Sequence, residues 1–288
     1  MNIPAPTGDD DVLGAALWVV ATPIGNLRDI SARALAVLAQ VDAIAAEDTR
    51  VTAQLLSHYS VQKPLLALHE HNEAKVVPQL VERMQQGQRI ALVSDAGTPL
   101  ISDPGYRLVR AAQTAELKIS TAPGVCALTT ALSVSGMATD RFHFEGFLAA
   151  KAASRRQRLQ ELSDYQHTLV FYESAHRVVA SLTDMAAVFG GDREACLCRE
   201  LTKRFETVRR SPLAELAAWV QADADQRRGE LVLVVAGQAA ADESIPAGAY
   251  RLFEQLRELM PPGKAARIAA DTFGCSRRAL YQQQIVDD

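Results

Sequence analysis

The chain is poor in cysteine and has no long apolar run, and each shortage excludes a class of protein. No stretch reaches the ~18 apolar residues of a membrane span, so we expect no membrane partner. Residues 1–14 contain three consecutive aspartates but no basic region, which predicts a flexible tail and not a signal peptide. The cysteines lack zinc-ligand spacing, so we expect no metal and reduced thiols in a cytoplasmic protein. They are Cys126, Cys196, Cys198 and Cys275.

Several signatures of catalysis and phosphate binding are also missing. Neither G-x-G-x-x-G nor G-x-x-x-x-G-K-[ST] occurs, which removes the usual devices for holding a pyrophosphate or triphosphate. The absence of G-x-S-x-G leaves a serine hydrolase without support. The net charge of −4 means that the protein is not basic all over, so a nucleic-acid binder would need local basic patches.

What the chain does have is a repeated strand–loop–helix pattern, most clearly around residues 89–105. The apolar run Ile90–Val93 predicts a buried parallel strand, which ends in the small-residue stretch Ser94–Pro99. Similar units recur about five times in the first ~120 residues, as expected for a mostly parallel sheet covered by helices on both faces. In such sheets ligands bind at the carboxyl ends of the strands, although a plain strand-to-helix turn would use the same residue types.

Composition shifts divide the chain further. A Pro-Gly pair inside 121–127 predicts a hinge, and strand and helix patterns resume beyond it. We therefore expect an α/β fold with two α/β domains, at residues 15–122 and 123–240. A small C-terminal helical, helix–turn–helix-like segment follows at 245–288.

Three small-residue loops lie at the predicted ligand edge, at 22–26, 95–99 and 123–127. Together they suit a nucleoside-like ligand without phosphate, and S-adenosyl-L-methionine fits that description. Sugar or amino-acid ligands would fit as well. Phe142, Phe144 and Phe147 alternate imperfectly along a predicted strand, and we interpret them as core.

Basic residues are clustered in the second half of the chain. Residues 263–281 carry four basic side chains against one acid, a net charge of three, which is a plausible nucleic-acid footprint or an ordinary solvated helical cap. The residues that we expect to contact RNA are Lys151, Arg155, Arg177, Arg204, Lys264, Arg277 and Arg278.

Six stretches, taken in order, resemble the tetrapyrrole methylase superfamily, and within it the ribosomal RNA small subunit methyltransferase I family. They span nearly the whole chain. They are Leu17–Ser31, Glu47–Arg50, Leu92–Gly105, Ala122–Ala127, Phe171–Arg177 and Arg199–Glu206.

This resemblance implies a homodimer with S-adenosyl-L-methionine in a cleft between two α/β domains. It also implies methyl transfer to the ribose 2′-hydroxyl of one cytidine in the decoding region of 16S rRNA, in the small ribosomal subunit. Cys126 stands where relatives commonly have serine or threonine, so a hydroxyl contact to the cofactor would be weaker or missing. The implied cofactor contacts are Ile24, Gly25, Asp95, Ala96, Gly97, Thr98, Cys126, Ala127, Tyr172, Glu173 and Leu201.

Methyl transfer to a ribose hydroxyl needs a base, or a cation that stabilises the alkoxide, within hydrogen-bond reach. We favour Glu47 or Asp48 as the base, with Arg50 and Lys203 gripping phosphate or the developing oxyanion. Asp103 and Glu173 remain further candidates at the same edge. Two alternatives stay open: a small-molecule methylase of the tetrapyrrole type, and an RNA-binding assembly factor without catalysis.

Overall fold

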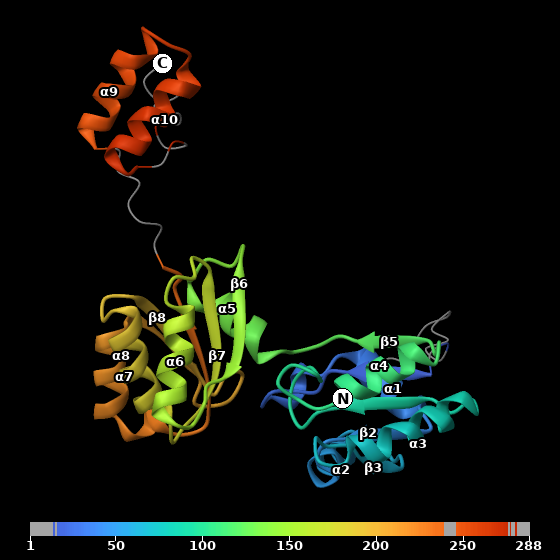
Figure 1. Ribbon diagram of the computed structural model, residues 1–288. Coiled ribbons are helices and arrows are strands. Elements are labelled where there is room, and N and C mark those ends of the chain that lie inside the picture. Colours follow the sequence, from blue (N-terminus) through green and yellow to red (C-terminus); the bar gives the residue numbers. More distant parts are fainter. Residues whose placement is uncertain (1–13, 15, 239–245, 276, 278–279, 281–288) are drawn as a thin grey trace. The chain divides into compact units, whose positions relative to one another are not determined.

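The computed structural model describes residues 14, 16–238, 246–275, 277 and 280. The chain divides into two compact units, residues 1–237 and 238–288. The larger unit contains two five-stranded sheets with their helices (Figure 1). No helix among the described residues is long and apolar enough to cross a membrane.

The first sheet is entirely parallel, in the order β3-β2-β4-β1-β5. Its strands are short, and apolar side chains on both faces are buried, as is usual for parallel sheets covered by helices. One face packs against α1 and α2, and the other against α3 and α4. The strands are β1 (Leu17–Val20), β2 (Ala43–Ala46), β3 (Leu65–Ala67), β4 (Ile90–Val93) and β5 (Ile119–Ala122).

The helices of this half begin where the sequence offers caps. Ser31 accepts a hydrogen bond from the amide of Ala34 at the start of α1, and Asp48 accepts one from Arg50 at the start of α2. Pro78 lies inside α3. The elements are the 3₁₀ turn η1 (Leu27–Asp29), α1 (Ala32–Gln40), α2 (Thr49–His58), α3 (Glu73–Gln85), α4 (Tyr106–Thr114) and α5 (Ala127–Ser135).

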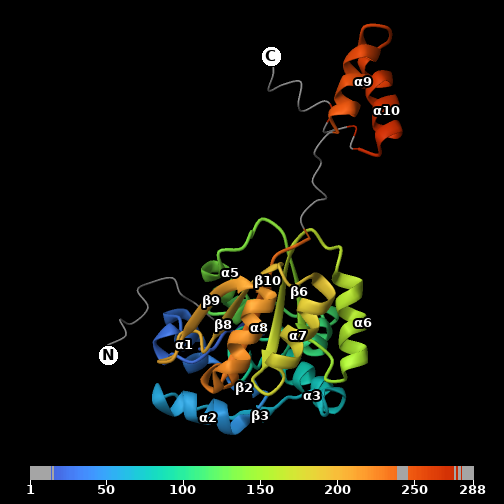
Figure 2. The same ribbon diagram turned by 90° about the vertical axis from the view of Figure 1, so that its left-hand side faces the viewer.

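The second sheet is mixed, in the order β6-β7-β10-β8-β9, with β6 and β7 parallel and the other pairs antiparallel. Helices α6, α7 and α8 lie side by side over one face (Figure 2). Helix α5 covers part of the other face. The strands are β6 (Phe142–Phe147), β7 (Thr168–Ser174), β8 (Glu194–Arg199), β9 (Thr207–Pro212) and β10 (Glu230–Val235). The helices are α6 (Ala152–Leu162), α7 (Val178–Phe189), α8 (Leu213–Ala222) and the 3₁₀ turn η2 (Ala224–Arg227).

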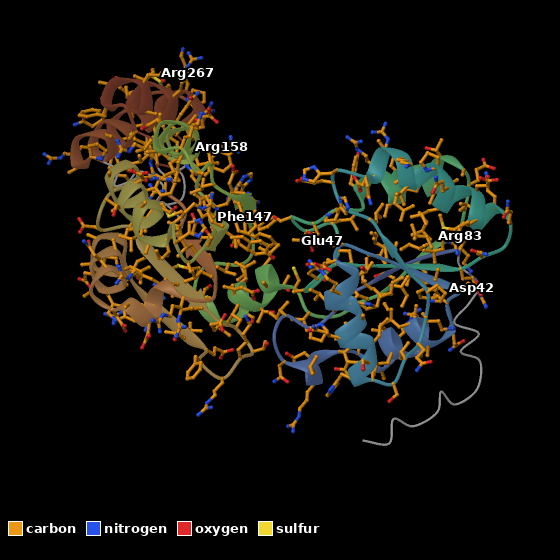
Figure 3. The ribbon with its side chains drawn as sticks, turned by 90° about the horizontal axis from the view of Figure 1, so that it is seen from below. Asp42, Glu47, Arg83, Phe147, Arg158 and Arg267 are labelled. Carbon is orange, nitrogen blue, oxygen red and sulfur yellow. The ribbon has the colours of Figure 1, made fainter. Side chains whose placement is uncertain are left out.

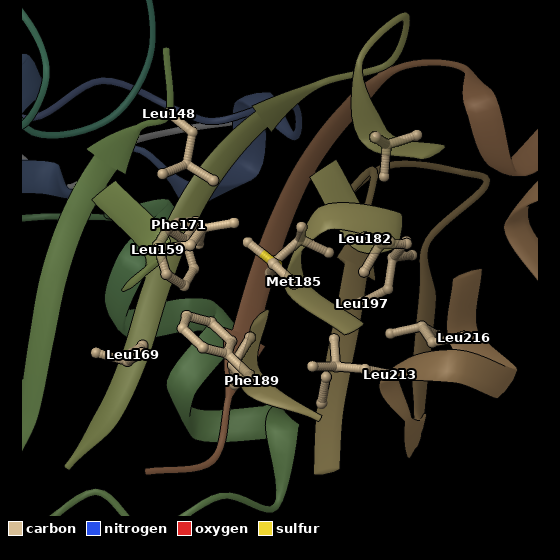
Figure 4. Close-up of a cluster of buried hydrophobic side chains, with 14 of the residues drawn as sticks. Leu148, Leu159, Leu169, Phe171, Leu182, Met185, Phe189, Leu197, Leu213 and Leu216 are labelled. Atoms are coloured by element: carbon tan, nitrogen blue, oxygen red, sulfur yellow. The ribbon is translucent and has the colours of Figure 1, made fainter. Parts of the chain in front are cut away.

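The largest core cluster lies between this sheet and its three helices (Figure 4). Phe171 and Leu197 come from the strands, and Leu159, Leu182 and Met185 come from the helices; all five are fully buried. Burying side chains of this size stabilises the fold by about 1.5–3 kcal/mol each.

The smaller unit contains α9 (Ala247–Arg257) and α10 (Pro262–Phe273), which pack through alanines and Phe253. Pro262 occupies the first position of α10, and Gly274 ends that helix with a left-handed backbone. The sequence pattern predicts three short helices over residues 250–286, and most of the third lies outside the described residues.

Predicted element boundaries were close, with a few shifts. The sequence pattern predicts a helix from Pro104, and the helix begins at Tyr106; it predicts another over about 175–189, and that helix begins at Val178. The prediction that Phe142 and Phe147 are core residues is wrong, because their side chains are 44% and 54% exposed.

Candidate functional site

The three predicted small-residue loops meet at the carboxyl edge of the first sheet. Thr22 and Gly97 exchange both backbone hydrogen bonds, at 2.8 and 3.0 Å between nitrogen and oxygen. The Thr98 hydroxyl donates to the carbonyl of Val125 at 3.0 Å, which ties the second loop to the third. These contacts hold residues that are far apart in the sequence as one wall.

A cavity of about 370 Å³ opens between this wall and the end of the second sheet. That volume lies within the usual range for small-molecule sites. The lining includes nine of the eleven predicted cofactor residues, all except Gly25 and Asp95. They are Ile24, Ala96, Gly97, Thr98, Cys126, Ala127, Tyr172, Glu173 and Leu201.

Glu173 differs from the other eight residues of that list, because its carboxylate is already engaged by protein partners. It accepts hydrogen bonds from the hydroxyl of Ser181 and, at 2.7 Å, from the amide of Ser174. Arg177 adds an ion pair at 3.1 Å. Glu173 therefore builds the wall, and its 4% exposure leaves it no role as a free base.

Gly97 contributes main chain without a side chain to the wall of the cavity. Its φ of +83° lies in the left-handed region that favours glycine, and a Cβ there would lie 3.2 Å from Cγ2 of Ile24. Glycine therefore suits the backbone conformation here, and its main chain forms part of the cavity wall. Gly25 is different, because a Cβ there would lie 2.4 Å from Cγ of Lys203.

Lys203 packs against Gly25 and is held by two carboxylates. Its amino group donates to Glu200 at 2.8 Å and to Glu230 at 2.9 Å. Gly25, Asp95 and Lys203 line a neighbouring hollow of about 360 Å³, whose wall also includes Ile24 and Ala96. These two bonds use two of the three N–H donors of the ammonium group, which leaves one for the predicted role of Lys203 in gripping an oxyanion.

Two acidic residues at this edge, Asp103 and Glu47, have pKa values above the ordinary range. Burial, with the neighbouring Asp95 carboxylate, raises the pKa of Asp103 to about 6, although a hydrogen bond with Ser94 opposes the shift. Partial burial, followed by the charges of Asp103 and Asp95, raises the pKa of Glu47. Asp103 lines the cavity; Glu47 is not among the residues that line it.

Asp48 is placed for a structural role. It caps α2 and forms an ion pair with Arg50 at 2.6 Å, and these hydrogen bonds lower its pKa to about 2. Arg50 itself is 87% exposed. Since neither residue lines the cavity, the structure argues against Asp48 as the base.

Tyr172 forms the floor of the cavity on the second sheet. Its hydroxyl accepts a hydrogen bond from the amide of Leu128 at 3.1 Å, and the sulfur of Cys126 lies 3.8 Å away. Burial, with the nearby Cys126, raises the pKa of Tyr172 well above its ordinary value. The contact joins the start of α5 to β7.

The predicted RNA contacts divide into surface and interior residues. Arg155 is a correction: it is buried at 5% exposure and paired with Asp184 at 2.6 Å, because the helical period turns it toward α7. Arg177 is half-buried, and its guanidinium binds Ser174 and the carbonyl of Leu148. Arg278 lies outside the described residues. The exposed members are Lys151, Arg204, Lys264 and Arg277.

Sequence reasoning missed the contribution of β10. Gly229, Leu231 and Val232 line the cavity because β10 runs antiparallel to β8, which brings its first residues to the edge where β8 ends. Residues 228–230 look like an ordinary turn, so the sequence carried no signal for this role. Phe147, Ile101 and Ser102 were also missed as lining residues.

Comparison with known proteins places this site in a family. Residues 16–217 match the Tetrapyrrole (Corrin/Porphyrin) Methylases, and residues 243–284 match the RsmI C-terminal HTH domain. The ribosomal RNA small subunit methyltransferase I of Pseudomonas aeruginosa is 53% identical over 93% of this chain and 96% of its own length. The protein of the same name from Escherichia coli O157:H7 is 50% identical over 92% and 93%.

Solved structures show the same fold at low sequence identity. The methyltransferase CobJ aligns with a TM-score of 0.59 and 16% identity, covering 78% of this chain and 95% of its own. Cobalt precorrin-4 methyltransferase CbiF aligns with a TM-score of 0.55 and 15% identity, covering 76% and 94%. With a family match over residues 16–217 and relatives about half identical along nearly the whole chain, this protein belongs to the ribosomal RNA small subunit methyltransferase I family of the tetrapyrrole methylases.

Proposed function

We propose that this protein transfers a methyl group from S-adenosyl-L-methionine to the ribose 2′-hydroxyl of a cytidine in the decoding region of 16S rRNA. Family membership supports the methyltransferase activity and the cofactor. The relatives' names supply the small-subunit rRNA substrate. The observation that carries the reaction is a half-buried carboxyl, Asp103, which lines the same cavity as the bare backbone of Gly97.

The residues of the cavity fit this cofactor. Gly97 lets the main chain approach a ligand, while Ile24 and Leu201 offer apolar surface for an adenosine. The carboxylates of Asp95 and Glu47 lie at the same edge and favour a cationic ligand over a phosphate. When bound, S-adenosyl-L-methionine supplies an electrophilic methyl group on a sulfonium.

Asp103 is the base that the geometry favours. A base must reach the hydroxyl whose proton it takes, and Asp103 lines the cavity where Glu47 and Asp48 do not. Its pKa of about 6 leaves it ionised at neutral pH yet more basic than an ordinary aspartate. Asp103 would take the 2′-hydroxyl proton as the oxygen approaches the methyl group, and the rest of the rate gain comes from positioning.

The test is a single-turnover assay with labelled cofactor and small ribosomal subunits from cells that lack this activity. We expect wild type to label one 2′-O-methylcytidine, and D103N to lose about 100-fold or more in rate, since a general base usually contributes at least that much. Calorimetric titration should give D103N the cofactor affinity of wild type.

Asp48→Asn is the matched control, because asparagine also caps a helix and keeps a polar side chain at this edge. It should remain within a few-fold of wild type. The proposed function fails if wild type labels no ribosomal RNA. The assignment of the base alone fails if wild type is active and D103N keeps its rate.

Two further aspects belong to this proposal. We propose a homodimer, as the family resemblance implies, and light scattering of the purified protein would measure its mass. A ribosomal substrate would also place the enzyme in the cytoplasm. The corrin methylases, at 15% and 16% identity, share the fold with this chain, and that likeness does not extend to their substrates.

A further inference from the structure

Phe147 is an aromatic side chain at the cavity that the cofactor site and the base do not account for. It is 54% exposed, and among the described residues it is the exposed aromatic side chain that lines this cavity. In Figure 3 it lies on the side of the second sheet that faces the first-sheet loop carrying Glu47. Other apolar side chains of the same lining, such as Leu231 and Val232, are buried, so Phe147 is distinct in offering an exposed ring to the cavity.

A β-bulge directs Phe147 to this position. The register between β6 and β7 shifts between Phe144 and Gly146, so that Phe144 opposes Val170 and Phe147 opposes Tyr172. Three positions apart, the two phenylalanines would point to opposite faces of a regular strand, but the extra residue returns both to one face. Gly146 has a φ of +73°, and a Cβ there would lie 3.2 Å from the Ser102 hydroxyl.

The ring of Phe147 packs against Tyr172. Its centroid lies 5.7 Å from that of Tyr172 at an interplanar angle of 67°, and Phe144 packs on the same tyrosine at 4.9 Å. The next residue, Leu148, is buried in the main core, and Arg177 donates to its carbonyl at 3.3 Å. The Phe147 ring therefore packs on Tyr172 while about half of the side chain stays exposed, and we call this ring the aromatic platform.

A nucleobase fits such a platform. Proteins that recognise single-stranded RNA splay bases out of their stack and place them on aromatic side chains. Asp103 and Phe147 line the same cavity, so a ribose whose 2′-hydroxyl reached Asp103 would leave its base close to the other lining residues, among which Phe147 is exposed and aromatic. We propose that Phe147 stacks on the base of the nucleotide that is methylated and so positions its ribose; this inference rests on the proposed function.

The experiment compares Phe147 variants on an RNA oligonucleotide of the decoding-region sequence and on unmethylated small subunits. We expect F147A to lower kcat/KM by about 10- to 100-fold, the size of a base-stacking contact. F147W and F147Y should recover most of the rate, whereas F147L, which is apolar but has no ring, should not. Phe142→Ala is the matched control, because Phe142 is 44% exposed on the same strand and does not line the cavity.

An abasic ribose at the methylated position separates stacking from packing. Wild type should lose rate on the abasic RNA, and F147A should lose little more, because both changes remove the same contact. Fully additive losses would overturn the proposal. So would a rate for F147A within three-fold of wild type, or a loss of cofactor affinity on calorimetric titration that accounts for the whole effect. If wild type methylates no RNA, the proposed function itself has failed.

Discussion

Asp48 and Asp103 lie at the same edge of the first sheet, yet their surroundings shift their pKa values in opposite directions. Asp48 receives hydrogen bonds from the side chain and amide of Arg50, which stabilise the carboxylate. Asp103 is removed from water and faces another carboxylate, which stabilises its protonated form. Residue type alone does not separate the two, because the difference comes from the neighbours that folding supplies.

The raised pKa of Asp103 predicts a pH dependence with a definite sign. As a base it must be ionised, so the logarithm of kcat/KM should rise with pH and level off above about 6. Stability should move in the other direction. The folded state holds this proton more tightly than the unfolded chain, so the contribution of Asp103 to stability falls as pH rises through 6.

Rate measurements between pH 5 and 8 on wild type and D48N would test this, and both should show the bend. Thermal melts of D103N at pH 7.5 should show a protein at least as stable as wild type. A pH profile for wild type without a bend near 6 would contradict the assignment.

The sequence could predict the loops of the site but not the aromatic platform beside it. Gly97 and Pro99 follow a recognisable apolar strand, so their position at the carboxyl edge follows from the pattern. Phe142, Phe144 and Phe147 do not keep a period of two, and a bulge that explains this becomes visible only when β6 is paired with β7. Long-range register is a property of the partner strand as much as of the strand itself.

At the scale of elements, the loop between β4 and α4 stores strain where it carries Asp103. Leu100 and Ser102 have φ values of +75° and +66°, in the region that disfavours side chains. The loop is anchored at its end, where the amide of Gly105 donates to the buried carboxylate of Glu73 at 2.8 Å. Helix α3 thereby fixes the conformation of a segment that lines the cavity.

Glu73 is therefore predicted to be a positioning residue. E73A should lower kcat by about 10-fold or more, since small misplacement of a reacting group is costly. Cofactor affinity should change less than kcat, because Gly97, in the first half of the same loop, is held separately by its two backbone hydrogen bonds with Thr22. E73Q keeps an acceptor for the Gly105 amide and should recover much of kcat, whereas equal defects in both variants would point to the charge of Glu73.

The packing of α6 on α7 gives a prediction with a built-in control. Asp184 binds two arginines at 2.6 Å, of which Arg155 is 6% exposed and Arg156 is 63% exposed. Loss of the buried partner should destabilise the protein by about 3 kcal/mol, because Asp184 keeps only a solvated partner. Loss of the exposed one should cost less than about 1 kcal/mol.

Denaturant titration of R155M and R156M would measure both values. RNA affinity of folded R155M should equal that of wild type, which separates a structural role from the RNA contact that the run of arginines suggested. The sequence alone does not make this distinction. Four basic residues within positions 151–158 indicate an exposed face, and only the packing of α6 on α7 shows which of them is buried.

At the scale of the whole molecule, the sequence pattern predicted the strands and helices of both sheets better than it predicted how the strands pair. Alternating strands and helices indicated a parallel sheet, and the first sheet is parallel throughout. The same pattern resumes after residue 127, but there the sheet is mixed, with β10 inserted between β7 and β8. Strand order depends on contacts that a local pattern does not record.

The separate C-terminal unit, residues 238–288, allows a prediction about how the enzyme holds its substrate. Lys264, Arg267 and Arg277 are exposed there, on a unit whose own core is closed by alanines and Phe253. Charges of this kind bind phosphates and release counterions, so affinity for RNA should fall with salt concentration. Reversing all three to glutamate should weaken RNA binding and lower the salt slope by about 2 for single-stranded RNA.

The cofactor should bind the triple variant as it binds wild type, because the cavity lies wholly within residues 1–237. Filter binding at several salt concentrations and calorimetry with the cofactor would measure the two quantities on the same preparation. A triple variant with unchanged affinity and slope would move substrate docking to the larger unit, where Lys151 and Arg204 are exposed. A loss of both RNA and cofactor binding would show that the two units are not energetically independent.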